Sequence, residues 1–277
     1  MLPTVAFADG TQVPALGQGT WHMGEDPSRR AAEAAVLREG IEHGLTLLDT
    51  AEMYGDGAAE EVVGEAIRGV RERVFLVSKV LPHNASRRAM GRACDASLRR
   101  LGTGWIDLYL LHWRGGVALA ETVEAFEGLR AQGRIRRWGV SNLDVADLAE
   151  LGPALGGCAA NQILWNLEHR GVEFDLLPFC AGLGMPVMAY SPLGQGGRLL
   201  RHRALADVAH RHGVEPAAVA LAFVLRRQGV IAIPKAATPA HLRANLAATA
   251  LRLEAADVSL LDGAFHPPRR KVPMEMI

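Results

Sequence analysis

The sequence has few cysteines, no net charge and no long apolar run. Its three cysteines, Cys94, Cys158 and Cys180, are widely spaced, and none belongs to a CxxC motif. This usage argues against a disulfide framework and against a zinc site, and it suits a reducing compartment. We therefore expect a cytoplasmic protein.

The charge balance disfavours two classes of partner. Lysine plus arginine number 30, and so do aspartate plus glutamate. Without a basic excess there is no strong field to attract nucleic acid or an anionic membrane surface. No stretch approaches the ~18 uncharged apolar residues of a membrane span, and the first residues lack the pattern of a signal peptide. We expect neither nucleic acid nor a membrane as a partner.

The chain has no Pro/Gly/Ser-rich linker and no repeat in its letters. It has 277 residues, of which 49% are apolar and 22% charged, so it can bury a large core. Because α/β barrels commonly reach ~250 residues as one unit, we expect a single domain over residues 1–277.

Short apolar runs alternate with amphipathic segments along the sequence. Core strands are predicted to end near residue 20 and to cover 45–48, 74–77, 106–111, 138–140, 159–163, 186–189 and 230–233. Helices are predicted over 29–43, 58–68, 86–100, 120–132, 144–151, 203–213, 215–227 and 240–249. Several runs are almost continuously apolar, which is typical of strands buried on both faces. Residues 5–13, with the pair Asp9-Gly10, predict an N-terminal β-hairpin with a tight turn.

About eight β/α units indicate either a closed barrel or a large doubly wound sheet. The doubly wound fold needs a phosphate-binding glycine loop after its first strand, and Gly17-Gln-Gly-Thr-Trp does not continue into G-x-G-x-x-G. We therefore expect an α/β fold of the (β/α)8 TIM-barrel type with an N-terminal β-hairpin.

Polar side chains follow one predicted strand after another. Each of them taken alone could be a helix cap or a loop residue. In a (β/α)8 barrel, however, all these strand ends meet on one face, where active sites are built. The pattern predicts a site formed by Asp49, Lys79, His112, Ser141, Asn142, Gln162, Tyr190, Ser191 and Lys235.

The segment 48–64 and the strand ends together resemble the aldo-keto reductase family. The family's tetrad of Asp, Tyr, Lys and His falls on Asp49, Tyr54, Lys79 and His112. Its other motifs match Gly139-Val-Ser141-Asn142, Asn161-Gln162, Tyr190-Ser-Pro-Leu-Gly194 and Ile233-Pro-Lys235. The resemblance covers nearly the whole chain, including the hairpin, which closes the barrel floor in that family.

The resemblance implies an enzyme that reduces aldehydes and ketones to alcohols with a nicotinamide cofactor. Tyr54 would be the general acid, although a phenol, with a pKa of about 10, is a poor acid at neutral pH. A neighbouring ammonium lowers such a pKa, so Lys79, held by Asp49, is expected to lower the pKa of Tyr54. His112 would donate a hydrogen bond to the carbonyl oxygen and orient it.

The resemblance also implies a cofactor site. Its expected residues are Thr20, Trp21, Asp49, Ser141, Asn142, Gln162, Tyr190, Ser191, Leu193, Gly194, Gln195, Gly196, Lys235, Thr238, His241 and Asn245. Where the family has an arginine that clamps the 2′-phosphate, this chain has His241, which removes a bidentate contact. NADPH is the expected cofactor, and NADH is the alternative.

The substrate side is expected to be open and shallow. Its predicted lining is Trp21, Met53, Tyr54, His112 and Trp113. The connection after His112 and the segment after Phe265 are both short, so neither is expected to add much to the mouth. Such a pocket suits small or polar carbonyls, for example methylglyoxal or sugar-derived aldehydes. The resemblance suggests a monomer.

Two other functions are known for barrels of this general shape. A barrel of this kind can be a cofactor-binding regulatory module with little turnover, like the potassium-channel β-subunit relatives, but the intact tetrad argues against it. A metal-dependent barrel hydrolase needs clustered ligands at the strand ends, and His83, His112 and His169 do not have that spacing.

Overall fold

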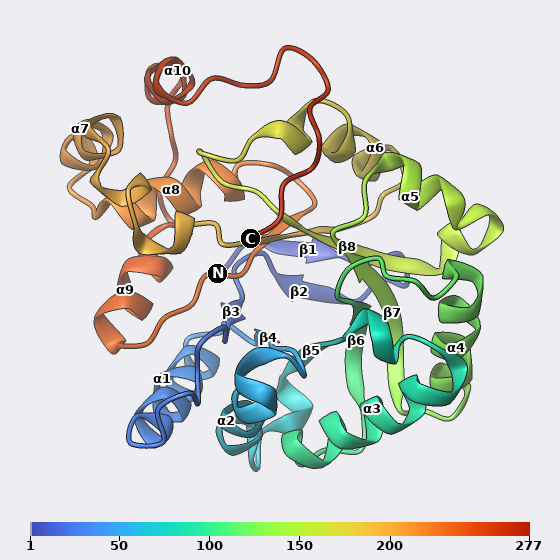
Figure 1. Ribbon diagram of the computed structural model, residues 1–277. Coiled ribbons are helices and arrows are strands. Elements are labelled where there is room, and N and C mark those ends of the chain that lie inside the picture. Colours follow the sequence, from blue (N-terminus) through green and yellow to red (C-terminus); the bar gives the residue numbers. More distant parts are fainter. Residues whose placement is uncertain (1) are drawn as a thin grey trace.

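The computed structural model describes residues 2–277, and its eight core strands run parallel in one sheet. They are neighbours in chain order: β3 Gln18–Gly19, β4 Leu47–Asp49, β5 Phe75–Val80, β6 Ile106–Leu111, β7 Ile135–Ser141, β8 Cys158–Leu164, β9 Val187–Tyr190 and β10 Val230–Ala232. The two edges meet, because the Gly17 N–H donates to the Ala232 carbonyl and the Ala232 N–H donates to the Ala15 carbonyl, both at 2.8 Å. The predicted (β/α)8 barrel is therefore confirmed (Figure 1).

Helices lie outside the strands and cover the barrel (Figure 1). They are α1 Arg30–Glu42, α2 Ala58–Ile67, α3 Arg87–Leu101, α4 Leu119–Ala131, α5 Val145–Glu150, α6 Leu176–Gly182, α7 Arg203–His212, α8 Pro216–Leu225, α9 Pro239–Ala247 and α10 Ala255–Ala264. All eight predicted helices are present within a few residues. Helices α6 and α10 were not predicted: α6 has only 7 residues and contains Pro178, and α10 has no strong apolar stripe.

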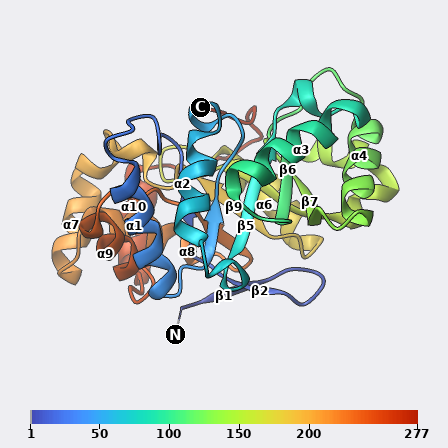
Figure 2. The ribbon, with the colours of Figure 1, turned by 90° about the horizontal axis from the view of Figure 1, so that it is seen from below.

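The N-terminal hairpin is confirmed, although its turn differs from the prediction. Strands β1 (Thr4–Ala6) and β2 (Gln12–Pro14) pair antiparallel. Residues 7–11 connect them, so the connection is longer than a two-residue turn, and the Phe7 N–H donates to the Thr11 carbonyl at 2.9 Å. The hairpin lies at the end of the barrel opposite the C-terminus (Figure 2).

Apolar side chains fill the barrel and the layer between strands and helices. Inside the barrel, Val5, Phe7 and Val13 of the hairpin pack with the inward side chains of the strands. Burying one such side chain stabilises the fold by about 1.5–3 kcal/mol. This packing closes the floor and leaves the carboxyl ends of the strands as the accessible end. No helix within residues 2–277 is both long and apolar enough to cross a membrane.

Candidate active site

Three of the four proposed catalytic side chains are linked at the ends of β4 and β5. Lys79 Nζ lies 2.7 Å from Asp49 Oδ1 and 3.1 Å from Tyr54 Oη. It also donates to the Thr50 carbonyl at 2.9 Å. The Lys79 side chain is fully buried and that of Asp49 is 2% exposed. An ammonium has three N–H donors, so all three have a partner and the group is fixed in place.

Asp49 is itself held from two further strands. Its second carboxylate oxygen accepts a hydrogen bond from Gln162 Nε2 at 2.7 Å, and its backbone carbonyl accepts one from Thr20 Oγ1 at 2.9 Å. Residues from β5 and β8 therefore contact the Asp49 carboxylate, and Thr20, which follows β3, contacts the Asp49 backbone. Sequence reasoning assigned Gln162 and Thr20 to the cofactor; their contacts here also orient Asp49.

Burial and the contacts among Asp49, Lys79 and Tyr54 shift the pKa values of Lys79 and Tyr54. Burial alone would lower the pKa of Lys79, but the contacts with Asp49 and Tyr54 together outweigh it and raise that pKa, so the ammonium is retained. Burial raises the pKa of Tyr54 above its ordinary value, and Lys79 only partly opposes this. Lys79 thus lowers the pKa of Tyr54, as expected, but desolvation of the phenolate is the larger effect, so the pKa as a whole lies above its ordinary value.

His112 follows β6 and completes the group. Its ring meets the Tyr54 ring edge-on, with 5.8 Å between centroids and 73° between planes. Burial and the nearby Lys79 ammonium lower the pKa of His112 to about 3. Within residues 2–277 its Nδ1 has no hydrogen-bond partner. The imidazole is therefore neutral near pH 7 and can orient a carbonyl oxygen, but it is no source of an acidic proton.

Amides and hydroxyls gather at the ends of β7, β8 and β9. Tyr190 Oη donates to Asn142 Oδ1 at 2.9 Å, and Asn142 Nδ2 donates to the His112 carbonyl at 3.1 Å and to Ser141 Oγ at 3.1 Å. Gln162 lies one strand further along and reaches Asp49. Donors and acceptors thus stand side by side next to the tetrad, and this arrangement suits a carboxamide.

The glycine-rich loop after β9 has the backbone of an anion-binding loop. Ser191, Gly194, Gln195 and Gly196 all have positive φ, of 46°, 57°, 58° and 70°. Residues in such turns can direct successive N–H groups to one side, where an anion binds. The buried Asn166 donates to the Ser191 carbonyl at 2.9 Å and so supports the loop. Sequence reasoning missed Asn166, although a polar residue after β8 was the available signal.

The last group of predicted cofactor residues lies by α9. Thr238 caps this helix by accepting a hydrogen bond from the His241 N–H at 3.2 Å. Asn245 is buried, His241 is exposed, and burial lowers the pKa of Lys235. Within residues 2–277, the side chains of Lys235 and His241 make no hydrogen bond or ion pair. Contacts with other residues of the protein hold the tetrad side chains in place, whereas the side chains of Lys235 and His241 have no such polar contacts within the described residues.

The substrate side is less open than predicted. Trp21 stacks on His22 with centroids 4.1 Å apart, Trp113 lies 4.8 Å from the His112 ring, and Met53 is 38% exposed. The short connection after His112 is confirmed, because α4 begins at Leu119. The C-terminal segment 266–277, however, reaches the centre of the mouth, on the side opposite the hairpin (Figures 1 and 2).

Contacts along the C-terminal segment explain its path. Lys271 Nζ lies 3.0 Å from Asp175, and His169 Nδ1 lies 2.9 Å from Glu275. The backbone of Ile277 lies beside the Tyr190 hydroxyl. The expectation that this segment adds little to the mouth is therefore wrong: an ion pair and a hydrogen bond with residues that follow β8 hold it across the opening.

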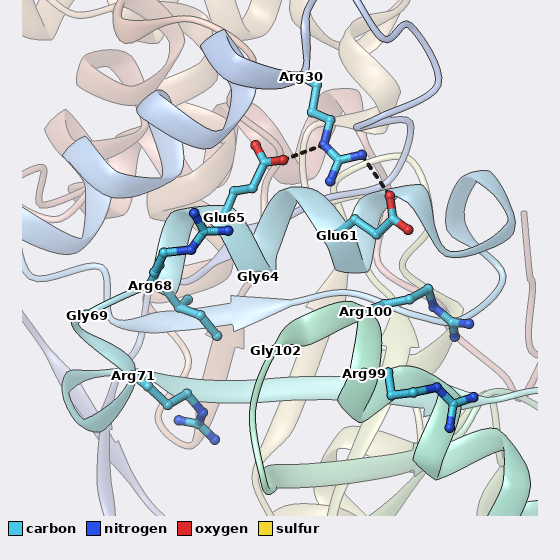
Figure 3. A pocket seen from close by; sticks show the side chains of 11 residues that line it. Arg30, Glu61, Gly64, Glu65, Arg68, Gly69, Arg71, Arg99, Arg100 and Gly102 are labelled. Atoms are coloured by element: carbon cyan, nitrogen blue, oxygen red, sulfur yellow. Dashed lines mark hydrogen bonds and ion pairs between the residues drawn. The ribbon is translucent and has the colours of Figure 1, made fainter.

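A separate cleft of about 440 Å³ lies among α1, α2 and α3, on the helical side of the barrel (Figure 3). It is lined by arginines, but Arg30 already pairs with Glu61 and Glu65, each at 2.7 Å. The other guanidinium groups do not point to one common place. Nor do residues 2–277 contain any group of three or more His, Cys, Asp or Glu side chains placed to hold a metal ion.

Comparisons with known proteins agree with this geometry. The model of the aldo/keto reductase family matches residues 15–265. Methylglyoxal reductase YeaE of Escherichia coli is 55% identical over 279 residues, covering 99% of this chain and 98% of that protein. Glyoxal reductase of Bacillus subtilis is 34% identical, covering 84% and 82%. The structure of an aldo/keto reductase from Klebsiella pneumoniae, in complex with NADP and acetate, has a TM-score of 0.97 and 52% identity and covers all of both chains.

Proposed function

The chain belongs to the aldo-keto reductase family, and from this membership we propose that it reduces small carbonyl compounds to alcohols with NADPH. The observation that carries the proposal is the buried contact of Lys79 with both Asp49 and Tyr54, at 2.7 and 3.1 Å. This arrangement places a phenol beside a permanent ammonium at the mouth of the barrel. It is suited to giving a proton to an oxygen that gains negative charge.

In this mechanism the side chains of the protein carry out the proton transfer. When bound, reduced nicotinamide supplies a hydride to the carbonyl carbon. Tyr54 Oη transfers its proton to the carbonyl oxygen, and Lys79 stabilises the phenolate left behind. Asp49 keeps the ammonium charged and fixed. The neutral His112 orients the carbonyl oxygen by hydrogen bonding, and preorganised contacts of this kind need no rearrangement during the reaction.

Several groups at the ends of β7–β10 would hold the cofactor. Ser141, Asn142 and Gln162 offer the donors and acceptors that a carboxamide needs, and Tyr190 offers an aromatic face. The left-handed loop 191–197 suits the pyrophosphate, and Lys235 with the N-terminus of α9 suits a further phosphate. The NADP complex of the Klebsiella relative supports this assignment. NADH is the alternative, because His241 replaces the expected arginine.

Small carbonyls are the proposed substrates. The names of the Escherichia and Bacillus relatives point to methylglyoxal and glyoxal. The C-terminal segment lies over the mouth, and we expect a large apolar ligand to bind poorly there because it would leave most of its surface in water. Among polar carbonyls, sugar-derived aldehydes are also proposed.

The test is a kinetic comparison of methylglyoxal, a nitrobenzaldehyde and a steroid ketone with NADPH, repeated with NADH. We expect methylglyoxal to have the highest kcat/KM of the three and a KM in the upper part of the ~1 μM–1 mM range or above it. A steroid with the highest value would contradict the proposed substrate class. Tight NADPH binding without turnover of any carbonyl would instead favour a regulatory module.

We further propose that residues 1–277 form one domain and act as a monomer in the cytoplasm. All eight core strands belong to one sheet, and Cys94, Cys158 and Cys180 are buried free thiols whose pKa burial raises to about 12. Such thiols are inert and suit a reducing compartment. Light scattering across a concentration series would test the monomer, and fractionation of cells would test the location in the cytoplasm.

A further inference from the structure

Glu60 is a buried carboxylate that the proposed reaction does not use. It lies in the first turn of α2, and its side chain is fully buried. Oε1 accepts a hydrogen bond from the Ser78 hydroxyl at 2.6 Å, and Oε2 accepts one from Arg100 Nε at 2.7 Å. One side chain thus connects α2 with β5 and with α3.

Arg100 lies against the turn that follows Tyr54. The 3₁₀ segment η1 (Tyr54–Gly57) has three consecutive residues at positive φ: Gly55 at 56°, Asp56 at 52° and Gly57 at 96°. A left-handed residue other than glycine is uncommon and persists only where its surroundings hold it. A Cβ added at Gly57 would collide with Arg100 Nε, so the guanidinium lies directly on this backbone. Arg100 therefore braces the turn that carries Tyr54.

The other oxygen of Glu60 acts on the strand that carries Lys79. Ser78 precedes Lys79 in β5, and successive side chains of a strand point to opposite faces. Lys79 points into the barrel toward Asp49, whereas Ser78 points outward to Glu60 on α2. The Glu60 carboxylate thus contacts Ser78, next to Lys79, and Arg100, which lies against the turn after Tyr54. It therefore supports both partners of the 3.1 Å contact between Lys79 and Tyr54.

We propose that the Glu60–Arg100 ion pair is a positioning device that keeps Tyr54 Oη within hydrogen-bonding distance of Lys79 Nζ. This inference rests on the proposed function, in which that contact prepares the proton donor. Stability alone does not explain the pair, because replacing a buried ion pair by uncharged groups of similar volume is often neutral or stabilising. Its removal should therefore loosen the turn without unfolding the protein.

The test compares two double variants. Glu60→Gln/Arg100→Met removes the proposed device, and Arg71→Met/Asp107→Asn removes a pair of 2.6 Å near the amino-terminal ends of β5 and β6. For the first we expect kcat to fall about tenfold to a hundredfold, because small displacements of reacting groups have effects of this size. The KM for methylglyoxal, the NADPH Kd and the melting temperature should stay close to wild type. The control should keep its kcat.

A conservative substitution at Arg100 tests whether kcat is partly restored. Arg100→Lys keeps the charge but lacks the forked guanidinium, so its kcat should lie between those of the wild type and the double variant. Loss of kcat in proportion to loss of melting temperature and NADPH affinity would show a merely structural role and overturn the proposal. So would an equal fall of kcat in the control.

A second readout does not depend on activity. The chain has only three tyrosines, so ¹³C labelling of the phenol Cζ gives three signals, and Tyr54→Phe identifies the one from Tyr54. In Glu60→Gln/Arg100→Met this signal should move, while that of Tyr190 and all signals of the control stay in place. An unmoved Tyr54 signal in the folded variant would refute positioning. If the wild type reduced no carbonyl, the proposed function would fail, and this readout would still decide about the turn.

Discussion

The two ends of the candidate site differ in how much of their geometry the protein builds by itself. At the reacting end, Lys79 and Asp49 are buried and paired, and each is tied to further strands. At the α9 end, His241 is exposed, and neither its side chain nor that of Lys235 makes a hydrogen bond or ion pair within residues 2–277. The reacting end is preorganised, and this is where electrostatic stabilisation needs rigid partners. The α9 end is less constrained, and there the chain departs from the family pattern.

The largest expected effect comes from breaking the preorganised end. Lys79→Met should reduce kcat/KM by about 10²–10⁴-fold, because Tyr54 loses the charge that stabilises its phenolate. The same change leaves the Asp49 carboxylate buried and unpaired, at a cost of about 3–5 kcal/mol of stability. Kinetics with methylglyoxal and thermal melts would measure both. Near-normal turnover would mean that the proton donor does not depend on Lys79.

The pH dependence tests the charge states at the same end. His112, with its pKa lowered to about 3, stays neutral throughout the ordinary range. Tyr54 is a proton donor only below its own pKa, which burial raises, so activity is lost as pH rises through that value. We expect kcat/KM for reduction to be nearly flat from about pH 5 to 9 and to fall about tenfold per unit only beyond about pH 10. A decline centred near pH 6.5 would show that His112 titrates in the working enzyme.

The α9 end should respond more weakly. His241→Arg adds a guanidinium where the family has one, and a charge-assisted bond to phosphate contributes roughly 1.5–3 kcal/mol, which exposure at this rim reduces to about 1 kcal/mol. NADPH should then bind about fivefold more tightly, with NADH unchanged. Quenching of tryptophan fluorescence would give both dissociation constants. Equal gains for NADPH and NADH would place His241 away from the 2′-phosphate.

The smallest effect is expected at the C-terminal segment. Lys271→Ala removes the contact with Asp175 across the mouth. Exposed pairs contribute about 0–1 kcal/mol, so the KM for methylglyoxal should change by less than about fivefold and kcat should stay the same. Steady-state kinetics would check this. A large fall in kcat would mean that the segment takes part in the chemistry.

A feature could be predicted from the sequence where neighbouring residues determine it, and could not where contacts between distant residues determine it. Buried parallel strands are continuous apolar runs, so the strands and the closed barrel could be predicted from the pattern, whereas the tetrad with Tyr54 was predicted from the resemblance to the family. Segment 266–277 has no periodicity, and its path depends on Asp175 and His169, which are distant in sequence. Likewise, the pKa of Tyr54 depends on how deeply the ring is buried, which residue spacing does not reveal.

The most direct test of the account is a single-turnover experiment on Tyr54→Phe with NADPH bound first and methylglyoxal added second. The substitution removes one hydroxyl and keeps the ring that packs beside His112. NADPH should bind as in the wild type, and the rate of its oxidation should fall by at least about 10²–10⁴-fold, the usual contribution of a positioned acid. Oxidation at more than a few per cent of the wild-type rate, with normal NADPH binding, would contradict the assignment of Tyr54 as the proton donor.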